Sequence, residues 1–281
     1  MLQKPNIKYP FFAYGIFKPG QIAYSRIEKY VKYVSQEDIK HRLFLRDGIP
    51  FISRDSDETF NTSGFLIEFR EDFLYDAYDV ICEVESEKLY YWKEILVCGK
   101  PANVLIGRKP SRSRPIPIGK NFDGSADPYF NEAIEVISDE IKEYKKIMKE
   151  SYKEFDEIKC FFKLQRNYIL LWAAIERYTG LKYGNGSKSS NNEKFSEECI
   201  FQESLKKHIG EKERRKIYRT DTLDKIELDS SSPKDSIDYY YTIRCNIVHR
   251  GKTPFNKGGI VLKSLEELLA IFQDVLDDTF K

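Results

Sequence analysis

The stretch YYYTIRCNIVHRGK, residues 239–252, indicates the fold of the carboxy-terminal half of the chain. Apolar side chains recur along it at the spacing of one helix face, at Ile237, Tyr240, Tyr241, Ile243, Ile247 and Val248. Gly251 stands where a helix C-terminal cap belongs, so the sequence predicts a helix that ends at His249 or Arg250. This helix carries Arg244 and His249 close to its end.

Three further stretches predict helices around it. Apolar residues recur every three or four positions from Phe130 to Met148 and from Phe161 to Tyr178, and the second helix is predicted to stop at Gly180. A closing helix is predicted from Ser264 to Phe280, with its apolar residues in the core. Residues 127–281 are therefore predicted to form an all-α helical bundle.

Two polar stretches interrupt the pattern. Residues 107–128, GRKPSRSRPIPIGKNFDGSADP, are rich in Pro, Gly, Ser and Arg and predict an extended linker between two domains. Residues 184–194, GNGSKSSNNEK, predict a mobile loop between bundle helices. Short β-rich runs precede the linker, so residues 1–120 are predicted to form an α+β domain or a small mixed β-barrel. The whole chain is therefore predicted to be α+β with two domains.

Composition narrows the function classes. With 46 basic and 45 acidic residues the formal net charge is +1, which argues against a protein that binds polyanions over its whole surface. A nucleic-acid contact would be local, for example along the basic run from Lys206 to Arg219, although interleaved glutamates make a solvated helix face equally consistent. Five cysteines without metal-ligand spacing, and no signal-peptide or membrane-span pattern, predict a reduced cytoplasmic protein.

Arg244 and His249 are a pair that can cleave RNA without a metal. A histidine supplies a proton-transfer group of near-neutral pKa, and an arginine supplies a fixed cation for the charge that builds on the phosphorane. Five residues along an ideal helix correspond to about 140° of rotation, so the two side chains do not share one face. The arginine could reach round the helix, or a second copy of the chain could complete the cleft. The alternative is that both side chains simply solvate a bundle helix.

At these residues the chain resembles the HEPN superfamily, whose members carry an Arg, four to six residues and then a His on a late helix of a small bundle. The resemblance implies a metal-independent ribonuclease that works as a homodimer through its helical domain. The polar residue that often follows the Arg in the family is replaced here by Cys245, so that role passes to Asn246. Asn246 is then expected in the catalytic site, where it would orient the substrate or the His. Glu176 and Lys252 are candidates for supporting roles.

The amino-terminal domain has its own candidate residues. FFAYGIFKPG, residues 11–20, predicts an apolar strand that runs into a turn, where backbone N–H groups can bind a carboxylate or oxyanion. ICEVESEKLYYW, residues 81–92, places Glu83 and Glu85 on one side if this segment is a regular strand. A carboxyl group between apolar neighbours can have a raised pKa and transfer protons.

Taken together, these residues resemble the gamma-glutamyl cyclotransferase (AIG2-like) family over about residues 9–120. Its first signature is matched by the run Tyr14, Gly15, Ile16 and Phe17, and its second by Glu85 with Tyr90 and Trp92. The resemblance implies that Glu85 relays a proton while the substrate's α-amine attacks its γ-carbonyl, and that the turn and Tyr90 hold the substrate. Ile16 replaces the usual Ser or Thr and Phe17 fills the space beside it, which predicts a narrowed or apolar pocket. Ser86 replaces a common Pro, which predicts a changed local backbone.

We therefore expect a HEPN-type endoribonuclease with a cyclotransferase-like domain that binds a ligand or regulates it, as in a stress, toxin or phage-defence effector. The first alternative is a gamma-glutamyl cyclotransferase whose helical domain only dimerises. The second is a non-catalytic interaction module. The expected partners are RNA, a second copy of the chain and a protein or small-molecule regulator. No Walker loop, dinucleotide-binding pattern or metal-ligand spacing indicates a cofactor or metal.

Overall fold

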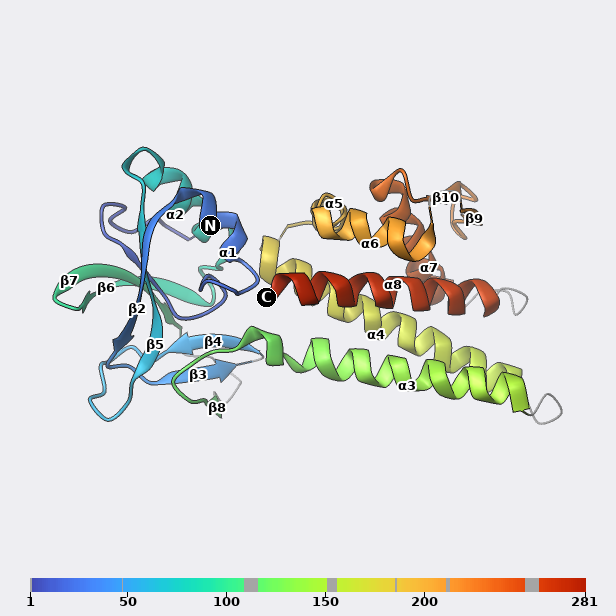
Figure 1. The fold of residues 1–281 in the computed structure, drawn as a ribbon, viewed down its shortest axis with the longest axis horizontal. Helices are drawn as coiled ribbons and strands as arrows, with labels where there is room; N and C mark the ends of the chain where they lie inside the picture. Colours follow the sequence, from blue (N-terminus) through green and yellow to red (C-terminus); the bar gives the residue numbers. More distant parts are fainter. Residues whose placement is uncertain are drawn as a thin grey trace. The chain divides into compact units, whose positions relative to one another are not determined.

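The computed structural model describes residues 2–46, 48–108, 116–150, 156–184, 186–210, 213–250 and 258–281. The chain divides into two compact units that are not simple consecutive halves (Figure 1). The first comprises Met1–Asp127 together with Gly180–Gly186 and Thr279–Lys281. The second comprises Pro128–Thr179 and Ser187–Asp278. The molecule is α+β, with a curled mixed sheet in the first unit and a helical second unit.

The first unit contains a sheet of mixed direction, in the order β2-β5-β1-β7-β4-β3-β8, with β6 also paired to β7. β7 lies parallel to both β1 and β4, and the other pairs are antiparallel. The strands are β1 (Phe11–Ala13), β2 (Val31–Ile39), β3 (Leu43–Arg46), β4 (Ile49–Ile52), β5 (Thr62–Phe69), β6 (Tyr90–Val97), β7 (Lys100–Gly107) and β8 (Ile116–Pro117).

Aromatic side chains fill the core under this sheet. The rings of Phe11, Phe69 and Tyr78 each lie 5.6 Å, centroid to centroid, from a neighbouring ring of the same cluster, which also contains Trp92. Edge-on contacts of this kind are favourable beyond the area that they bury. Tyr78 also donates its hydroxyl proton to the carbonyl of Tyr9, at 2.6 Å, so the cluster fixes the entry into β1.

Short helices complete the first unit: α1 (Tyr24–Ile27), α2 (Leu74–Val84) and the 3-10 turns Glu28–Tyr30, Glu71–Phe73 and Gly124–Ala126. The prediction of a strand at residues 81–84 is wrong, because these residues form the last turn of α2. Ala77, Tyr78, Ile81 and Cys82 are buried at helical spacing, so the helix period outweighs the short alternation in the sequence.

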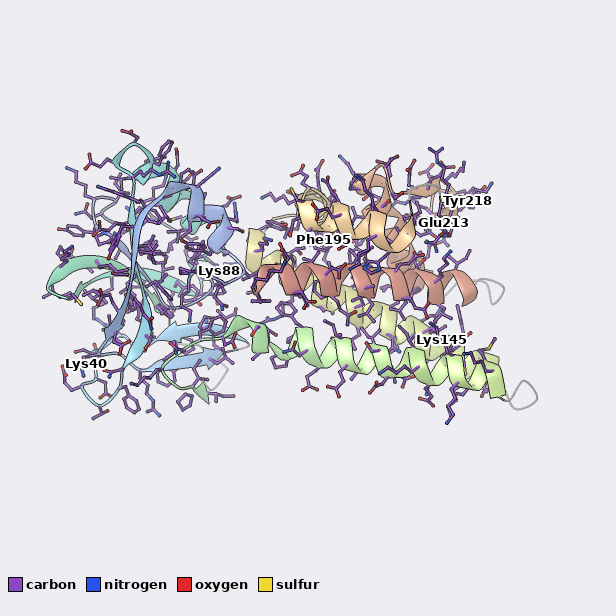
Figure 2. The ribbon with its side chains drawn as sticks, viewed as in Figure 1. Lys40, Lys88, Lys145, Phe195, Glu213 and Tyr218 are labelled. Carbon is purple, nitrogen blue, oxygen red and sulfur yellow. The ribbon has the colours of Figure 1, made fainter. Side chains whose placement is uncertain are left out.

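The second unit contains α3 (Pro128–Glu150), α5 (Lys188–Ser196), α6 (Cys199–Ile209), α7 (Pro233–Arg250), α8 (Gly258–Thr279) and all but the end of α4 (Glu157–Tyr183). Ion pairs join its helices, and the Nζ of Lys145 on α3 lies 2.7 Å from a carboxylate oxygen of Glu266 on α8 (Figure 2). The core is again aromatic, with Tyr178 in contact with Phe130, Phe195 and Phe272. None of the described helices is long and apolar enough to span a membrane.

One carboxylate of this unit has an unusually complete set of donors. Asp274 on α8 accepts hydrogen bonds from Ser204 at 2.8 Å and from Lys207 at 2.9 Å, and its Oδ2 lies 2.9 Å from Nε2 of His208. Burial acts to raise the pKa of Asp274, but these three partners outweigh it and lower the pKa to about 2.

The sequence predicts a purely helical second unit, and this prediction is wrong. Its described residues include β9 (Arg214–Tyr218) and β10 (Lys225–Asp229), which form an antiparallel pair. This hairpin follows α6 in the chain (Figure 1) and divides the basic run, whose first lysines end α6 while its arginines lie on or beside β9. Burial of Ile217 and Leu228 against the helices explains the strand, which the lysines and arginines around it conceal in the sequence.

Two predicted boundaries along α4 and α5 differ from the structure. α4 continues through Gly180 to Tyr183, and the stretch predicted to be a loop contains most of α5. Ser187 caps α5 by accepting a hydrogen bond from the N–H of Ser190, at 3.2 Å. Burial of Phe195, near the end of α5, stabilises a helix that its polar composition does not favour.

Candidate functional site

A cavity in the first unit brings together six of the candidate residues predicted there. Its lining includes Tyr14, Gly15, Ile16 and Phe17, which follow β1, together with Glu85 and Tyr90. The cavity has a volume of about 60 Å³. The other lining residues, which sequence reasoning missed, are Phe11, Ala13, Ile49, Pro50, Leu89, Leu105 and Leu181.

The turn after β1 is compact because its glycine touches another strand. A Cβ added to Gly15 would lie 2.9 Å from Cγ of Pro50, closer than real Cβ contacts. The N–H of Lys18 donates to the carbonyl of Gly15 at 3.1 Å and closes the turn. Within the described residues, the N–H groups of Gly15, Ile16 and Phe17 have no hydrogen-bond acceptor, so this wall of the cavity offers unused backbone donors.

Two buried tyrosines stand on either side of the acidic group. Tyr14 donates its hydroxyl proton to the carbonyl of Leu105 at 2.6 Å, and Tyr90 donates to the carbonyl of Pro50 at 2.5 Å. Burial, and then the negative charge of Glu85, raises the pKa of both phenols well above the usual value. Both hydroxyls therefore stay protonated, and the proton of each is already engaged in a hydrogen bond to a carbonyl oxygen.

Glu85 is the residue directly after α2, and its extended backbone (φ −85°, ψ 131°) turns the chain into the cavity wall. Its N–H donates to the carbonyl of Ile81 at 2.9 Å and caps the helix. The side chain is half-buried, and no described donor or cation contacts its carboxyl group. Burial raises the pKa of Glu85 to about 8, against an ordinary value of 4.5.

The neighbouring carboxylate has a different environment. Glu83 was predicted to lie on the same side of a strand as Glu85, and this is wrong because the two residues belong to the end of a helix and its cap. Glu83 is exposed, and its Oε2 lies 2.6 Å from the guanidinium of Arg26. Of the two carboxyl groups, only that of Glu85 lines the cavity.

The second set of candidates lies along α7. Arg244 is half-buried, and its Nη2 lies 3.4 Å from Oε1 of Glu176 on α4. Glu176 also contacts Lys188 on α5, at 3.1 Å, and the guanidinium of Arg244 lies 5.7 Å from the centre of the Tyr241 ring. The structure therefore brings Glu176 and Arg244 together, and it adds Lys188, which sequence reasoning missed because it lies in the stretch predicted to be a loop.

Asn246, the next candidate on α7, contacts the β9–β10 hairpin. Its Oδ1 accepts from both the N–H and the hydroxyl of Thr220, at 3.1 Å each, and its Nδ2 donates to the carbonyl of Tyr218 at 2.9 Å. The backbone of His249 lies in the last turn of α7, but its side chain is outside the described part of the chain, as is the whole of Lys252. Val248, predicted to face the core, is 45% exposed.

In the described ranges, no group of three or more His, Cys, Asp or Glu side chains is arranged to hold a metal ion. All five cysteines are free thiols. Cys245, beside Arg244, is half-exposed, whereas Cys82 and Cys160 are buried.

Comparisons with known proteins add little to this geometry. No protein-family model matches the sequence, and no curated protein matches it. Among solved structures, the chain is similar to an uncharacterized protein from Pyrococcus horikoshii, with 16% sequence identity and a TM-score of 0.34. That match covers 41% of this chain and 90% of the other. The functional argument therefore depends on the two sites themselves.

Proposed function

We propose that the first unit catalyses an intramolecular cyclisation of the gamma-glutamyl cyclotransferase type on a small γ-glutamyl amide. The observation that carries the proposal is the position of Glu85. A carboxyl group with a pKa of about 8 lines the same cavity as a turn with three unused backbone N–H groups. A proton-transfer group works best when its pKa lies near the operating pH, and backbone donors stabilise an oxyanion.

In the proposed reaction the ionised Glu85 carboxylate takes a proton from the substrate's α-ammonium group. The freed amine attacks the γ-carbonyl carbon, and the new C–N bond closes a five-membered ring. The negative charge that develops on the carbonyl oxygen is stabilised by the N–H groups of Gly15, Ile16 and Phe17. As the bond between carbon and the leaving nitrogen breaks, Glu85 gives its proton to that nitrogen, takes the second proton from the ring nitrogen and passes it to the released amine. The products are 5-oxoproline and the amine as its ammonium ion, with Glu85 ionised again.

The test is release of 5-oxoproline from γ-glutamyl amides by the purified chain. Glu85→Gln removes the proton relay without changing the size of the side chain, so we expect turnover to fall by roughly 10²- to 10⁴-fold. Glu87→Gln is the matched control, because Glu87 is exposed and does not line the cavity. Equal turnover by wild type and Glu85→Gln would refute the proposed role.

We further propose that the second unit is a metal-independent endoribonuclease of the HEPN type, with Arg244 and His249 as its catalytic residues. The contact of Arg244 with Glu176 supports this second function, because a half-buried arginine is held next to an acid on one face of α4 and α7. RNA phosphate would replace Glu176 as the partner of the guanidinium. A second copy of the chain would bring together residues that about 140° of helix rotation separates.

The roles proposed for the remaining residues follow from their contacts. Asn246 would hold the hairpin against α7, because its amide bonds join Thr220 and Tyr218 to that helix. Lys252 would support the site from beyond the end of α7. A cytoplasmic stress, toxin or phage-defence effector, in which the first unit binds a regulating ligand, is the biological setting that we propose by analogy.

Cleavage of total RNA and transfer RNA in the presence of EDTA tests this second function. We expect cleavage by wild type and its loss in both Arg244→Ala and His249→Ala, with cyclic-phosphate product ends. Arg166→Ala is the matched control, because Arg166 is an exposed arginine of the same unit. Cleavage that survives both substitutions would exclude the proposed site, as would cleavage that requires a metal.

A further inference from the structure

Few polar groups line the cavity around Glu85. The hydroxyl protons of Tyr14 and Tyr90 are already donated to the carbonyls of Leu105 and Pro50. What is left for a ligand is the Glu85 carboxyl group and the backbone N–H groups of the turn that follows β1. All other side chains that line the cavity are apolar. The tyrosine hydroxyl oxygens can still accept a hydrogen bond, but a ligand carboxylate placed away from Glu85 and the turn would lose water without gaining a donor.

The volume of the whole cavity, which Glu85 and the turn also line, limits what it can hold beside the reacting atoms. It is about 60 Å³, whereas an engineered cavity of roughly 150 Å³ holds a benzene molecule. In proportion, the cavity has room for an apolar group of two or three carbon atoms. The rest of the substrate would occupy the space that is open to solvent.

We infer that this site selects γ-glutamyl amides whose leaving amine carries a small apolar group, and that Leu181 sets the upper size of that group. The inference rests on the proposed cyclisation and names its substrate class. Leu181 lines the cavity with Ile49, Leu89 and Leu105, but it belongs to the last turn of α4, far along the chain from the other lining residues. Leu181 is therefore the one described lining residue of this cavity that lies outside residues 1–127.

Two contacts hold the Leu181 turn beside Glu85. The backbone of Gly184 (φ +83°) passes so close to α2 that an added Cβ would lie 2.6 Å from the carbonyl oxygen of Glu83. The guanidinium of Arg26 donates to the carbonyl of Lys182 at 3.4 Å and pairs with the carboxylate of Glu83 at 2.6 Å. The wall that carries Leu181 is therefore fixed to the residues that come directly before Glu85 in the chain.

Three probes of the same γ-glutamyl type separate polarity from size: γ-glutamylethylamide, γ-glutamylglycine and γ-glutamylisobutylamide. We expect wild type to turn over the ethylamide with a kcat/KM at least about tenfold above that of the glycine compound, because the glycine carboxylate finds no donor. The isobutylamide should be poor because it exceeds the available space. In Leu181→Ala, the ratio of isobutylamide to ethylamide should rise by about tenfold.

Binding to Glu85→Gln, measured by calorimetry, gives a readout that does not depend on turnover. The same order of affinities is expected, with the same shift when Leu181→Ala is added. Leu181→Val provides a smaller enlargement of the cavity and replaces Leu181→Ala if that variant unfolds. Leu170→Ala is the matched control, since it makes the same change on α4 at a position that does not line the cavity.

The outcomes separate the two proposals. Equal kcat/KM for the ethylamide and the glycine compound, or an isobutylamide ratio that Leu181→Ala leaves unchanged, would overturn the inference while the cyclisation stands. If no γ-glutamyl compound is turned over, the proposed cyclisation fails. In that case, binding of N-isobutylacetamide is compared with binding of N-ethylacetamide. If Leu181→Ala raises the affinity for N-isobutylacetamide relative to N-ethylacetamide, Leu181 is still the residue that limits size. If the ratio does not change, the inference fails as well.

Discussion

Carboxyl groups have different environments in the two units. In the first unit, the Glu85 carboxyl group is half-buried without a described donor, and its pKa is about 8. In the second, Asp274 has three donors and a pKa of about 2, and Glu176 lies between Arg244 and Lys188. A carboxyl group that has partners stabilises the fold, whereas one without partners costs stability and is available for chemistry. Glu85 therefore changes its charge near neutral pH, whereas Asp274 stays ionised there.

The largest test of this contrast is the stability of Glu85→Gln at high pH. The folded-state pKa of Glu85 is raised above its unfolded value, so native Glu85 holds a proton that the unfolded chain releases between about pH 4.5 and about pH 8. Stability therefore falls as pH rises through this window. At pH 9, Glu85→Gln should be more stable than wild type by up to about 5 kcal/mol, and at pH 4 the difference should vanish. Urea unfolding at the two pH values measures this, and a gain of equal size at both would contradict it.

Asp274→Asn should have the opposite sign. The folded-state pKa of Asp274 is depressed, so its contribution is fully present above its ordinary pKa of 3.8 and is lost as pH falls through about 2. At pH 7 the variant should lose up to about 2 kcal/mol in the free energy of unfolding, and at pH 2.5 most of that loss should disappear. Denaturant titrations at both pH values provide the measurement. A loss that does not depend on pH would show that packing, not charge, explains the effect.

The dependence of turnover on pH sharpens the comparison within the first unit. Only ionised Glu85 accepts a proton, and its pKa is about 8. We therefore expect kcat/KM for a γ-glutamyl amide to rise about tenfold per pH unit below that value and to level off above it. The substrate's own amine titrates in the same range, so an analogue with a less basic amine should be measured in parallel. A profile that is flat from pH 5 to pH 8 would mean that Glu85 transfers no proton.

The smallest effect is expected at Glu176. Its contacts with Arg244 and Lys188 are partly exposed, and such pairs contribute roughly 0–1 kcal/mol, so Glu176→Gln should unfold at nearly the wild-type denaturant concentration. RNA binding, measured by fluorescence anisotropy, should become tighter because Arg244 loses its internal partner. Lys188→Gln is the control that removes the other partner of Glu176. A large loss of stability in Glu176→Gln would show that the two units do not differ as argued.

The sequence predicts much of the fold where one period dominates. The apolar positions of α7, and Gly251 as the expected cap, predict a helix end at His249 or Arg250, and α7 ends at Arg250. The predicted end of α4 at Gly180 is wrong, because Gly184 can stop a helix as well as Gly180 can, and α4 continues to Tyr183. The contact of Gly184 with the backbone of Glu83, which is a tertiary contact, selects the second glycine.

The candidate site shows the same limit. Short motifs identify Tyr14 and Glu85, because an apolar strand that leads into a Tyr-Gly turn and an acid among apolar residues are local features of the sequence. Leu181 has no local signal, since its role depends on where the chain returns to the first unit. Lys188 was missed for a related reason: the composition of its stretch indicates a loop, and burial of Phe195 makes it a helix.

Because the first unit is built from separate segments of the chain, no single cut divides the protein into its two units. The chain passes between the units at residues 127/128, 179/180, 186/187 and 278/279, so neither unit is one uninterrupted stretch of polypeptide. A fragment that stops at Asp127 lacks Leu181 and the Gly184 turn, and its Glu85 cavity has lost a wall. Exchange of residues 128–179 and 187–278 would leave every lining residue in place, whereas a chimera that replaces everything after Asp127 would remove Leu181 from the cavity.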